Sequence, residues 1–244
     1  MQSKCARLDR FISVKTGINR KQVRALLAQS RVAVDGCWAR DIHQSINEFT
    51  HITLDGQVLQ AKTPVYVMMN KPLGVVSATL DAKNKTVIEV LNENLSDAMA
   101  EAMDTRELHI VGRLDFNTSG LLLLTNDGRW SRRVTAPEQK IAKLYRVTLA
   151  NPIAENYIQA FAEGMYFPYE DITTKPAKLE IISDYVAEVS LVEGRYHQIK
   201  RMFGRFQNPV VELQRLAIGN VMLDPALAAG ESRMLSAWEV ENIG

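Results

Sequence analysis

The residues best suited to chemistry fall in four short segments, at positions 69–74, 111–122, 143–147 and 193–202. One contains an aspartate, Asp115, within the stretch GRLDFNTSG, and another contains Tyr145. A carboxylate can act as a nucleophile or as a general base, and a neighbouring cation can keep it ionised. Each residue also has an ordinary explanation: Asp115 as a turn or cap residue, Tyr145 as a core side chain, and Lys200 as a solvated cation.

The sequence around these residues predicts mostly strands. Residues 121–125 form a continuous apolar run ending at an Asn-Asp-Gly turn, and residues 145–149 and 187–192 alternate between apolar and polar side chains. Such runs are typical of buried and half-buried strands. Strands outnumber helices and do not alternate with them regularly. The sequence therefore predicts an α+β fold whose larger part has a mixed, largely antiparallel sheet.

Charge is distributed unevenly along the 244 residues. Residues 1–62 contain ten Lys and Arg against five Asp and Glu, whereas the remainder is mildly acidic and the whole chain has a net charge of +1. A compact basic segment joined to an acidic body indicates a polyanion-binding module attached to a part with another task. Solvated basic faces are common, so charge alone leaves nucleic-acid binding open.

The basic segment reads as two short helices followed by strands. Gly17 is expected to end the first helix in a left-handed conformation, and Asn19 to cap the second. In the second helix Val23, Leu26 and Leu27 are expected to face inward. Their positions leave three cations on the opposite side, where they can reach phosphates: Arg20, Lys21 and Arg24.

Several classes of protein are disfavoured by composition. No apolar run approaches the roughly 20 residues of a membrane helix, and the first residues lack the apolar stretch of a signal peptide. Cys5 and Cys37 are far apart, without the spacing of a zinc site or a disulfide framework. The histidines show no metal-ligand pairing either. We expect a cytoplasmic protein without a metal.

Residues 6–58 resemble the S4 RNA-binding domain, through RLDRFI, GINRKQVRALLAQSRVAVDG and HITLDG. The four chemical segments, taken together and in this order, resemble the pseudouridine synthases of the RsuA/RluA superfamily. GRLDFNTSGLLLLTNDG with EGRYHQIKRM is a highly specific combination, and the S4-like segment is typical of the RsuA class. The resemblance implies two domains: an S4-like α/β RNA-binding domain at residues 1–60 and a catalytic domain at 61–244.

This resemblance also implies roles for individual residues. Asp115 matches the catalytic aspartate, and Tyr145 the tyrosine that packs on the target base. Lys200 matches the basic residue that pairs with the aspartate, a position where many superfamily members carry arginine, and Arg195 competes for that role. Two further matches are Arg113, which would fill the space left by the flipped nucleotide, and Leu213, which would pack on the other face of the uracil. Lys71-Pro72 is expected to support the local fold, or to contact a phosphate, and His197 to be structural.

The resulting prediction is a cofactor-independent isomerase that converts a uridine of ribosomal RNA to pseudouridine. Its partner would be ribosomal RNA or a partly assembled subunit, and we expect a monomer. The compact N-terminus, the DITTKPAKLEII segment and the lack of a long basic C-terminal tail favour small-subunit RNA, with large-subunit RNA as the alternative. A non-catalytic S4-type binding or assembly protein, and an RNA N-glycosidase, are the alternatives from other classes.

Overall fold

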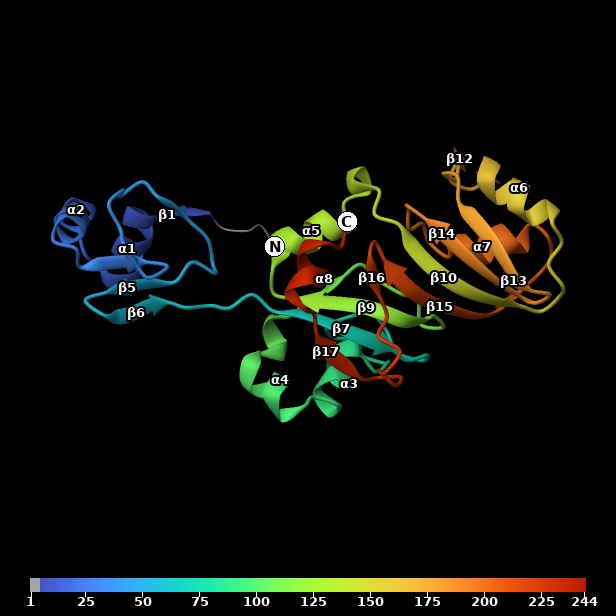
Figure 1. Ribbon diagram of the computed structural model, residues 1–244, viewed down its shortest axis with the longest axis horizontal. Coiled ribbons are helices and arrows are strands. Elements are labelled where there is room, and N and C mark those ends of the chain that lie inside the picture. The colour runs from blue at the N-terminus through green and yellow to red at the C-terminus, as the bar shows by residue number, and fades with distance from the viewer. Residues whose placement is uncertain (1–4) are drawn as a thin grey trace. The chain divides into compact units, whose positions relative to one another are not determined.

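The computed structural model describes residues 5–244, which divide into two compact units (Figure 1). The smaller unit ends at Pro64 and also includes residues 127–129, and the larger unit comprises the rest of the chain from Val65 onward. Within the described part of the chain, no helix is long and apolar enough to cross a membrane.

The smaller unit packs two helices against a four-stranded antiparallel sheet. The helices are α1 (Leu8–Thr16) and α2 (Arg20–Ala28), and the sheet has the order β3 (Cys37–Trp38), β2 (Val32–Val34), β5 (Ile52–Leu54) and β6 (Gln57–Gln60), beside a short pair, β1 (Ala6–Arg7) with β4 (Ser45–Ile46). Gly17 ends α1 with φ of 76°, and the Asn19 side chain accepts a hydrogen bond from the backbone N–H of Lys21. The inward face of α2, with Val23, Leu26 and Leu27, is confirmed.

The larger unit is built on a sheet of nine strands. Its strands are β7 (Tyr66–Lys71), β8 (His109–Val111), β9 (Ser119–Thr125), β10 (Lys143–Leu149), β13 (Lys178–Ser183), β14 (Val186–Leu191), β15 (Val210–Ile218), β16 (Val221–Met222) and β17 (Ser232–Met234). The main order is β13-β14-β10-β15-β9-β7-β17, with β16 beside β15 and β8 beside β9. All pairs are antiparallel except β9 with β15, which confirms a mixed, largely antiparallel sheet.

Helices cover this sheet at several places (Figure 1). They are α3 (Val87–Glu93), α4 (Asp97–Ala102), α5 (Gly128–Thr135), α6 (Asn156–Glu163), α7 (Gln198–Gly204) and α8 (Ala237–Glu241), with 3₁₀ turns η1 (Thr105–Glu107) and η2 (Pro137–Gln139) and a small hairpin of β11 (Tyr166–Phe167) and β12 (Ile172–Thr173). In Figure 1, α3 and α4 lie on one side of β7 and β9, and α5 and α8 lie on the other.

Strand β9 is apolar throughout because both of its faces are buried. Leu122 and Leu124 belong to the core shared with α3 and α4, whereas Leu121 and Leu123 belong to the core shared with Trp130 of α5. Side chains alternate between the faces of a strand, so a continuous apolar run follows when helices cover both faces. This is the physical reason for the run at residues 121–125.

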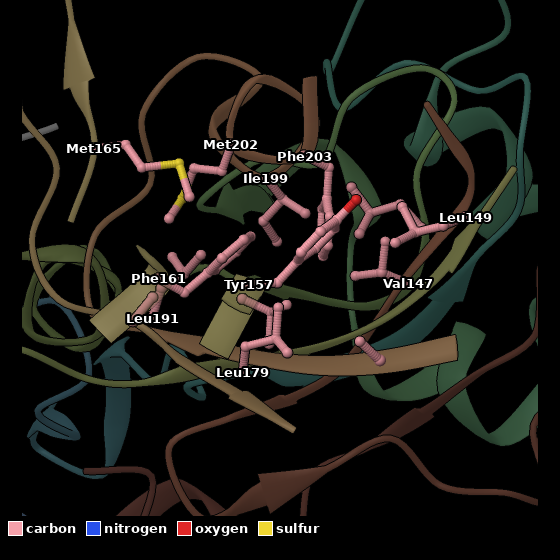
Figure 2. Close-up of a cluster of buried hydrophobic side chains, with 14 of the residues drawn as sticks. Val147, Leu149, Tyr157, Phe161, Met165, Leu179, Leu191, Ile199, Met202 and Phe203 are labelled. Carbon is pink, nitrogen blue, oxygen red and sulfur yellow. The ribbon is translucent and has the colours of Figure 1, made fainter. Parts of the chain in front are cut away.

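A further core anchors α7 to the sheet (Figure 2). Ile199, Met202 and Phe203 of α7 pack with Tyr157 and Phe161 of α6 over the strands β10, β13 and β14. The rings of Phe161 and Phe203 have centroids 4.8 Å apart. Because these three side chains fix α7, Lys200 on the same helix is held in place as well.

The parallel pairing of β9 with β15 is short and very close. It joins Gln214 with Ser119 and Arg215 with Gly120. Gly120 has φ of 100°, and a Cβ atom there would lie 2.3 Å from the Arg215 carbonyl oxygen. Only glycine fits this contact, which brings the loop before β9 against the wall formed by β15.

Candidate active site

A cavity of about 600 Å³ opens in the larger unit beside the seam between β9 and β15. It is lined by the loop before β9, by β10 and β15, and by the segment from Leu191 to Lys200. Six residues to which the resemblance gave roles at the catalytic centre line it: Arg113, Asp115, Tyr145, Arg195, Lys200 and Leu213. Its size suits a single nucleotide or small ligand.

Asp115 lies on the loop between β8 and β9, and its side chain is 36% exposed. The Asp115 carbonyl oxygen accepts the backbone N–H of Thr118, which closes a turn. Beneath the loop lies Lys71, whose side chain is completely buried. Its Nζ donates to the carbonyl oxygens of Pro72 at 3.0 Å, Asp115 at 3.2 Å and Thr118 at 2.9 Å. Lys71 thus holds the main chain of the loop at Asp115 and at Thr118.

Two more contacts hold the same loop. The Ser77 hydroxyl donates to the Leu114 carbonyl oxygen at 2.8 Å and accepts the Leu114 N–H at 3.1 Å. The Gly74 N–H donates to the Phe116 carbonyl oxygen at 3.0 Å. Segment 71–77 therefore serves to hold the Asp115 loop. The alternative role for Lys71, a phosphate contact, does not fit a side chain with no exposed surface.

Burial lowers the pKa of Lys71 to about 8, because the charged ammonium loses its hydration. The Asp115 carboxylate opposes this fall, and the positive charge of Arg215 adds to it. The three carbonyl acceptors replace the lost hydration, because they accept all three N–H groups of the ammonium. A charged group is thus retained in the interior to hold a loop.

His197 is close to the carboxylate, with its Nε2 3.5 Å from Asp115 Oδ2. Its backbone has φ of 49°, an uncommon conformation for a residue other than glycine, and its ring stacks on Tyr196 with centroids 3.9 Å apart. The expectation of a structural histidine stays a prediction, and the structure adds that His197 lines the cavity beside Asp115. Neither the alternation of apolar residues nor the motif could predict the positive φ of His197.

Lys200 and Arg195 both line the cavity but differ in their partners. Arg195 Nε lies 3.1 Å from Glu193 Oε2, and Gln198 Nε2 donates to the other Glu193 oxygen at 2.6 Å. Neither Lys200 nor Arg195 forms an ion pair with Asp115 among residues 5–244. Pairing of Lys200 with Asp115 stays a prediction, and Arg195 is held by Glu193.

Tyr145 and Leu213 occupy adjacent strands and the same face of the sheet. In the register of β10 with β15, Tyr145 is opposite Arg215 and Val147 is opposite Leu213, so Tyr145 and Leu213 are diagonal neighbours. Both side chains line the cavity, and Leu213 also belongs to the buried core that contains Phe203 of α7. Two neighbouring strands thus present an aromatic and an aliphatic side chain at the same wall of the cavity.

In the smaller unit the three cations of α2 are not equivalent. Lys21 and Arg24 are exposed, and no ion pair is seen for either of them within residues 5–244. Arg20 Nη2, in contrast, lies 2.7 Å from Oδ2 of the buried Asp9, which also forms an ion pair with Arg7. Burial opposes ionisation of Asp9, but the hydrogen bonds from Arg7 and Arg20 hold the pKa of its carboxyl well below its usual range. Arg20 therefore secures α2 to α1.

Sequence reasoning underestimated Lys71 and missed Arg215. Both are charged residues at inward positions of strands, Lys71 at the end of an apolar run and Arg215 between Leu213 and Ala217. A charge at a position that the strand pattern assigns to the core is the signal that could have found them. Among residues 5–244, no group of three or more His, Cys, Asp and Glu side chains forms a possible metal site.

Comparison with known proteins gives consistent matches over nearly the whole chain. The family model described as RNA pseudouridylate synthase matches residues 65–204. A protein of Pseudomonas aeruginosa named ribosomal small subunit pseudouridine synthase A is 45% identical, over 96% of this chain and 98% of the relative. The Escherichia coli K12 protein of the same name is 40% identical, over 97% and 99%. A crystal structure titled pseudouridylate synthase is 39% identical, with a TM-score of 0.68 over 98% and 99%.

The buried charge of Lys71 predicts a pH dependence of folding stability. Below about pH 8 both folded and unfolded chains hold the proton, so the cost of burial is fully present. As the pH rises from about 8 toward 10.5, the folded chain releases the proton before the unfolded chain does, and stability rises. Relative to Lys71→Met, wild type should gain up to about 1.4 kcal/mol of unfolding free energy per pH unit in this window.

Urea denaturation of both proteins between pH 7 and pH 10 measures this difference. The exposed Lys175→Met variant controls for loss of a positive charge elsewhere on the larger unit. A difference between wild type and Lys71→Met that stays constant over the range would show that Lys71 is not a buried ammonium.

Proposed function

Because this chain belongs to the RNA pseudouridylate synthase family, we propose that it converts a uridine of small-subunit ribosomal RNA to pseudouridine, with Asp115 as the catalytic carboxylate. The observation that carries the residue assignment is the position of Asp115: its carboxylate opens into the cavity on a loop whose main chain is fixed by Lys71 and Ser77. The choice of the small subunit rests on the names of the full-length relatives.

The reaction exchanges an N1–C1′ bond for a C5–C1′ bond without redox change, so the chain's own side chains can supply what it requires. The Asp115 carboxylate either attacks the nucleoside directly or removes the 2′ proton to give a glycal-type intermediate. Both routes need the carboxylate at the same place, and both free the uracil to rotate before C5 joins C1′. A confined cavity limits capture of the intermediate by water.

The other cavity residues have roles in holding the nucleotide. Tyr145 and Leu213 would receive the uracil between them, and stacking on an aromatic ring is typically worth about 1–3 kcal/mol per base. Arg113, exposed at the mouth, would fill the gap that the extruded uridine leaves in the RNA. Lys200 would balance the charge of Asp115 when RNA fills the cavity, and His197 lies beside the same carboxylate.

The smaller unit, in this proposal, is the S4-like module that binds RNA around the target. Its excess of basic residues, and the exposure of Lys21 and Arg24 on α2, support contacts with phosphates. Such contacts increase the local concentration of RNA without reading its sequence. The chemical step and the RNA-binding step would then be assigned to different units of the chain.

An Asp115→Asn variant should bind small-subunit RNA but make no pseudouridine. The amide keeps the shape of the side chain while removing the charge needed for attack or proton abstraction, so the rate should fall by at least about 10²- to 10⁴-fold. Carbodiimide modification followed by primer extension, on free RNA and on partly assembled subunits, maps the product. One stop that appears with wild type and is lost with the variant is the expected result.

Other outcomes of the same mapping contradict parts of the proposal. A stop in large-subunit RNA alone would reject the subunit assignment, and free uracil in place of pseudouridine would identify an N-glycosidase. Binding without any product from wild type would leave a non-catalytic RNA-binding protein. Normal turnover by Asp115→Asn would reject the assignment of the carboxylate.

Substitutions in α2 should separate RNA contacts from structural contacts. Lys21→Ala and Arg24→Ala should each weaken RNA affinity and leave thermal stability unchanged. Each should also reduce the slope of log K against log salt concentration by about one. Arg20→Ala should instead lower the thermal stability of the smaller unit, because it removes a partner from buried Asp9. Filter binding at several salt concentrations, together with thermal unfolding, makes the comparison. Equal effects of all three variants on stability would count against this division.

A further inference from the structure

Arg215 is a buried cation in the cavity wall that lacks an ionic partner. It is 4% exposed, and its Nε donates to the Leu121 carbonyl oxygen at 2.8 Å. Its Nη2 is buried without a hydrogen bond, and no carboxylate pairs with the guanidinium among residues 5–244. A buried charge with unused donors destabilises a fold, so its presence calls for a ligand or a function.

The surroundings of Arg215 point to the nucleotide that would enter the cavity. Arg215 is directly opposite Tyr145 in the register of β10 with β15, and it shares its face of the sheet with Leu213. Thr118, which also lines the cavity, has a buried hydroxyl without a hydrogen-bond partner. Two residues with unused polar groups thus line the same cavity as Tyr145 and Leu213.

Cations in this cavity are graded by depth. Arg113, Lys175 and Arg195 are exposed, whereas Lys143 is half-buried and Arg215 is buried. Loss of hydration and the nearby charge of Arg215 both lower the pKa of Lys143. RNA phosphates remain outside when a single base is extruded, so they meet the exposed cations. The buried cation, Arg215, would therefore be reached only by the extruded base.

We propose that the guanidinium of Arg215 binds a carbonyl oxygen of the flipped uracil and stabilises the negative charge that the ring acquires when its glycosidic bond breaks. This inference rests on the proposed function. It makes Arg215 a catalytic residue in addition to Asp115, with Thr118 as a second polar contact at the base of the cavity.

The chemistry balances without any further reactant. When the N1–C1′ bond breaks, its electron pair passes to the uracil ring and spreads over N1, O2 and O4. C1′ is meanwhile bonded to Asp115, or C2′ gives its proton to Asp115. After rotation, C5 forms the new bond to C1′; the Asp115–C1′ bond breaks as this bond forms or, on the glycal route, Asp115 returns its proton to C2′. C5 then releases its proton to a base and N1 takes up a proton, so Asp115 is regenerated as a carboxylate and the product is an isomer of the substrate. Arg215 donates N–H to a ring oxygen throughout and lowers the energy of the anionic stage, as donors do in an oxyanion hole.

Single-turnover kinetics on the full-length protein with saturating small-subunit RNA tests this role. Tritium release from RNA labelled at C5 of uridine gives the rate, and filter binding gives the affinity. Arg215→Gln should lower the rate by about 10²- to 10³-fold, the usual effect of losing one such donor. Arg215→Lys, which keeps the charge but not the fork of donors, should retain more activity. RNA affinity should stay within about threefold of wild type for both variants, since phosphate contacts dominate affinity.

Thermal unfolding separates this role from a structural one. Removing an unpaired buried charge should leave the melting temperature of Arg215→Gln unchanged or higher. The matched control is Arg146→Gln on β10, an exposed arginine paired with Glu188, which should keep wild-type turnover. Where Arg215→Gln does not fold, Arg215→Lys carries the same rate and affinity comparison.

Three results would overturn the inference. Weaker RNA binding with a smaller salt dependence and an unchanged saturated rate would make Arg215 a phosphate contact. Equal losses of rate in the Gln and Lys variants, together with a lower melting temperature, would make it structural. Wild-type rates in folded Arg215→Gln would remove any role while leaving the proposed function intact; absence of product from wild type would reject both.

Discussion

The Lys71 ammonium group lies out of contact with water beneath the Asp115 loop, where it donates to the carbonyl oxygens of Pro72, Asp115 and Thr118. A lysine in this position costs stability, and its lowered pKa reflects that cost. In return, the main chain of the loop is held at both Asp115 and Thr118 by one buried group. The carboxylate is therefore presented by a rigid support, although it belongs to a loop.

The cavity depends on how the sheet is joined as much as on this loop. Strands β9 and β15 form the one parallel pair of the sheet within residues 5–244, and the glycine at position 120 lets them approach. The seam places Asp115, from the loop before β9, near Tyr145, Leu213 and Arg215 on β10 and β15. In the proposed function, the exposed cations of this cavity meet the phosphates of the RNA and the buried Arg215 meets the base.

Sequence reasoning succeeded where a local pattern has one physical meaning. The strands at 121–125 and 145–149, the cap at Asn19 and the inward face of α2 follow from periodicity and capping, and all are confirmed. The motifs led to residues that line one cavity. Sequence could not reveal that Lys71 is fully buried, that His197 turns toward Asp115, or that Arg215 lacks a partner, because each depends on packing between distant segments.

The most direct test of the account is the single-turnover rate of Lys71→Met at saturating RNA. Methionine fills similar space without donating to the three carbonyl oxygens, so the Asp115 loop should lose its fixed course while the cavity walls remain. We predict a rate at least about 10²-fold below wild type, the usual consequence of a small misplacement of a reacting group, with unchanged RNA affinity. A folded Lys71→Met protein with the wild-type rate would contradict the claim that this buried lysine positions the catalytic carboxylate.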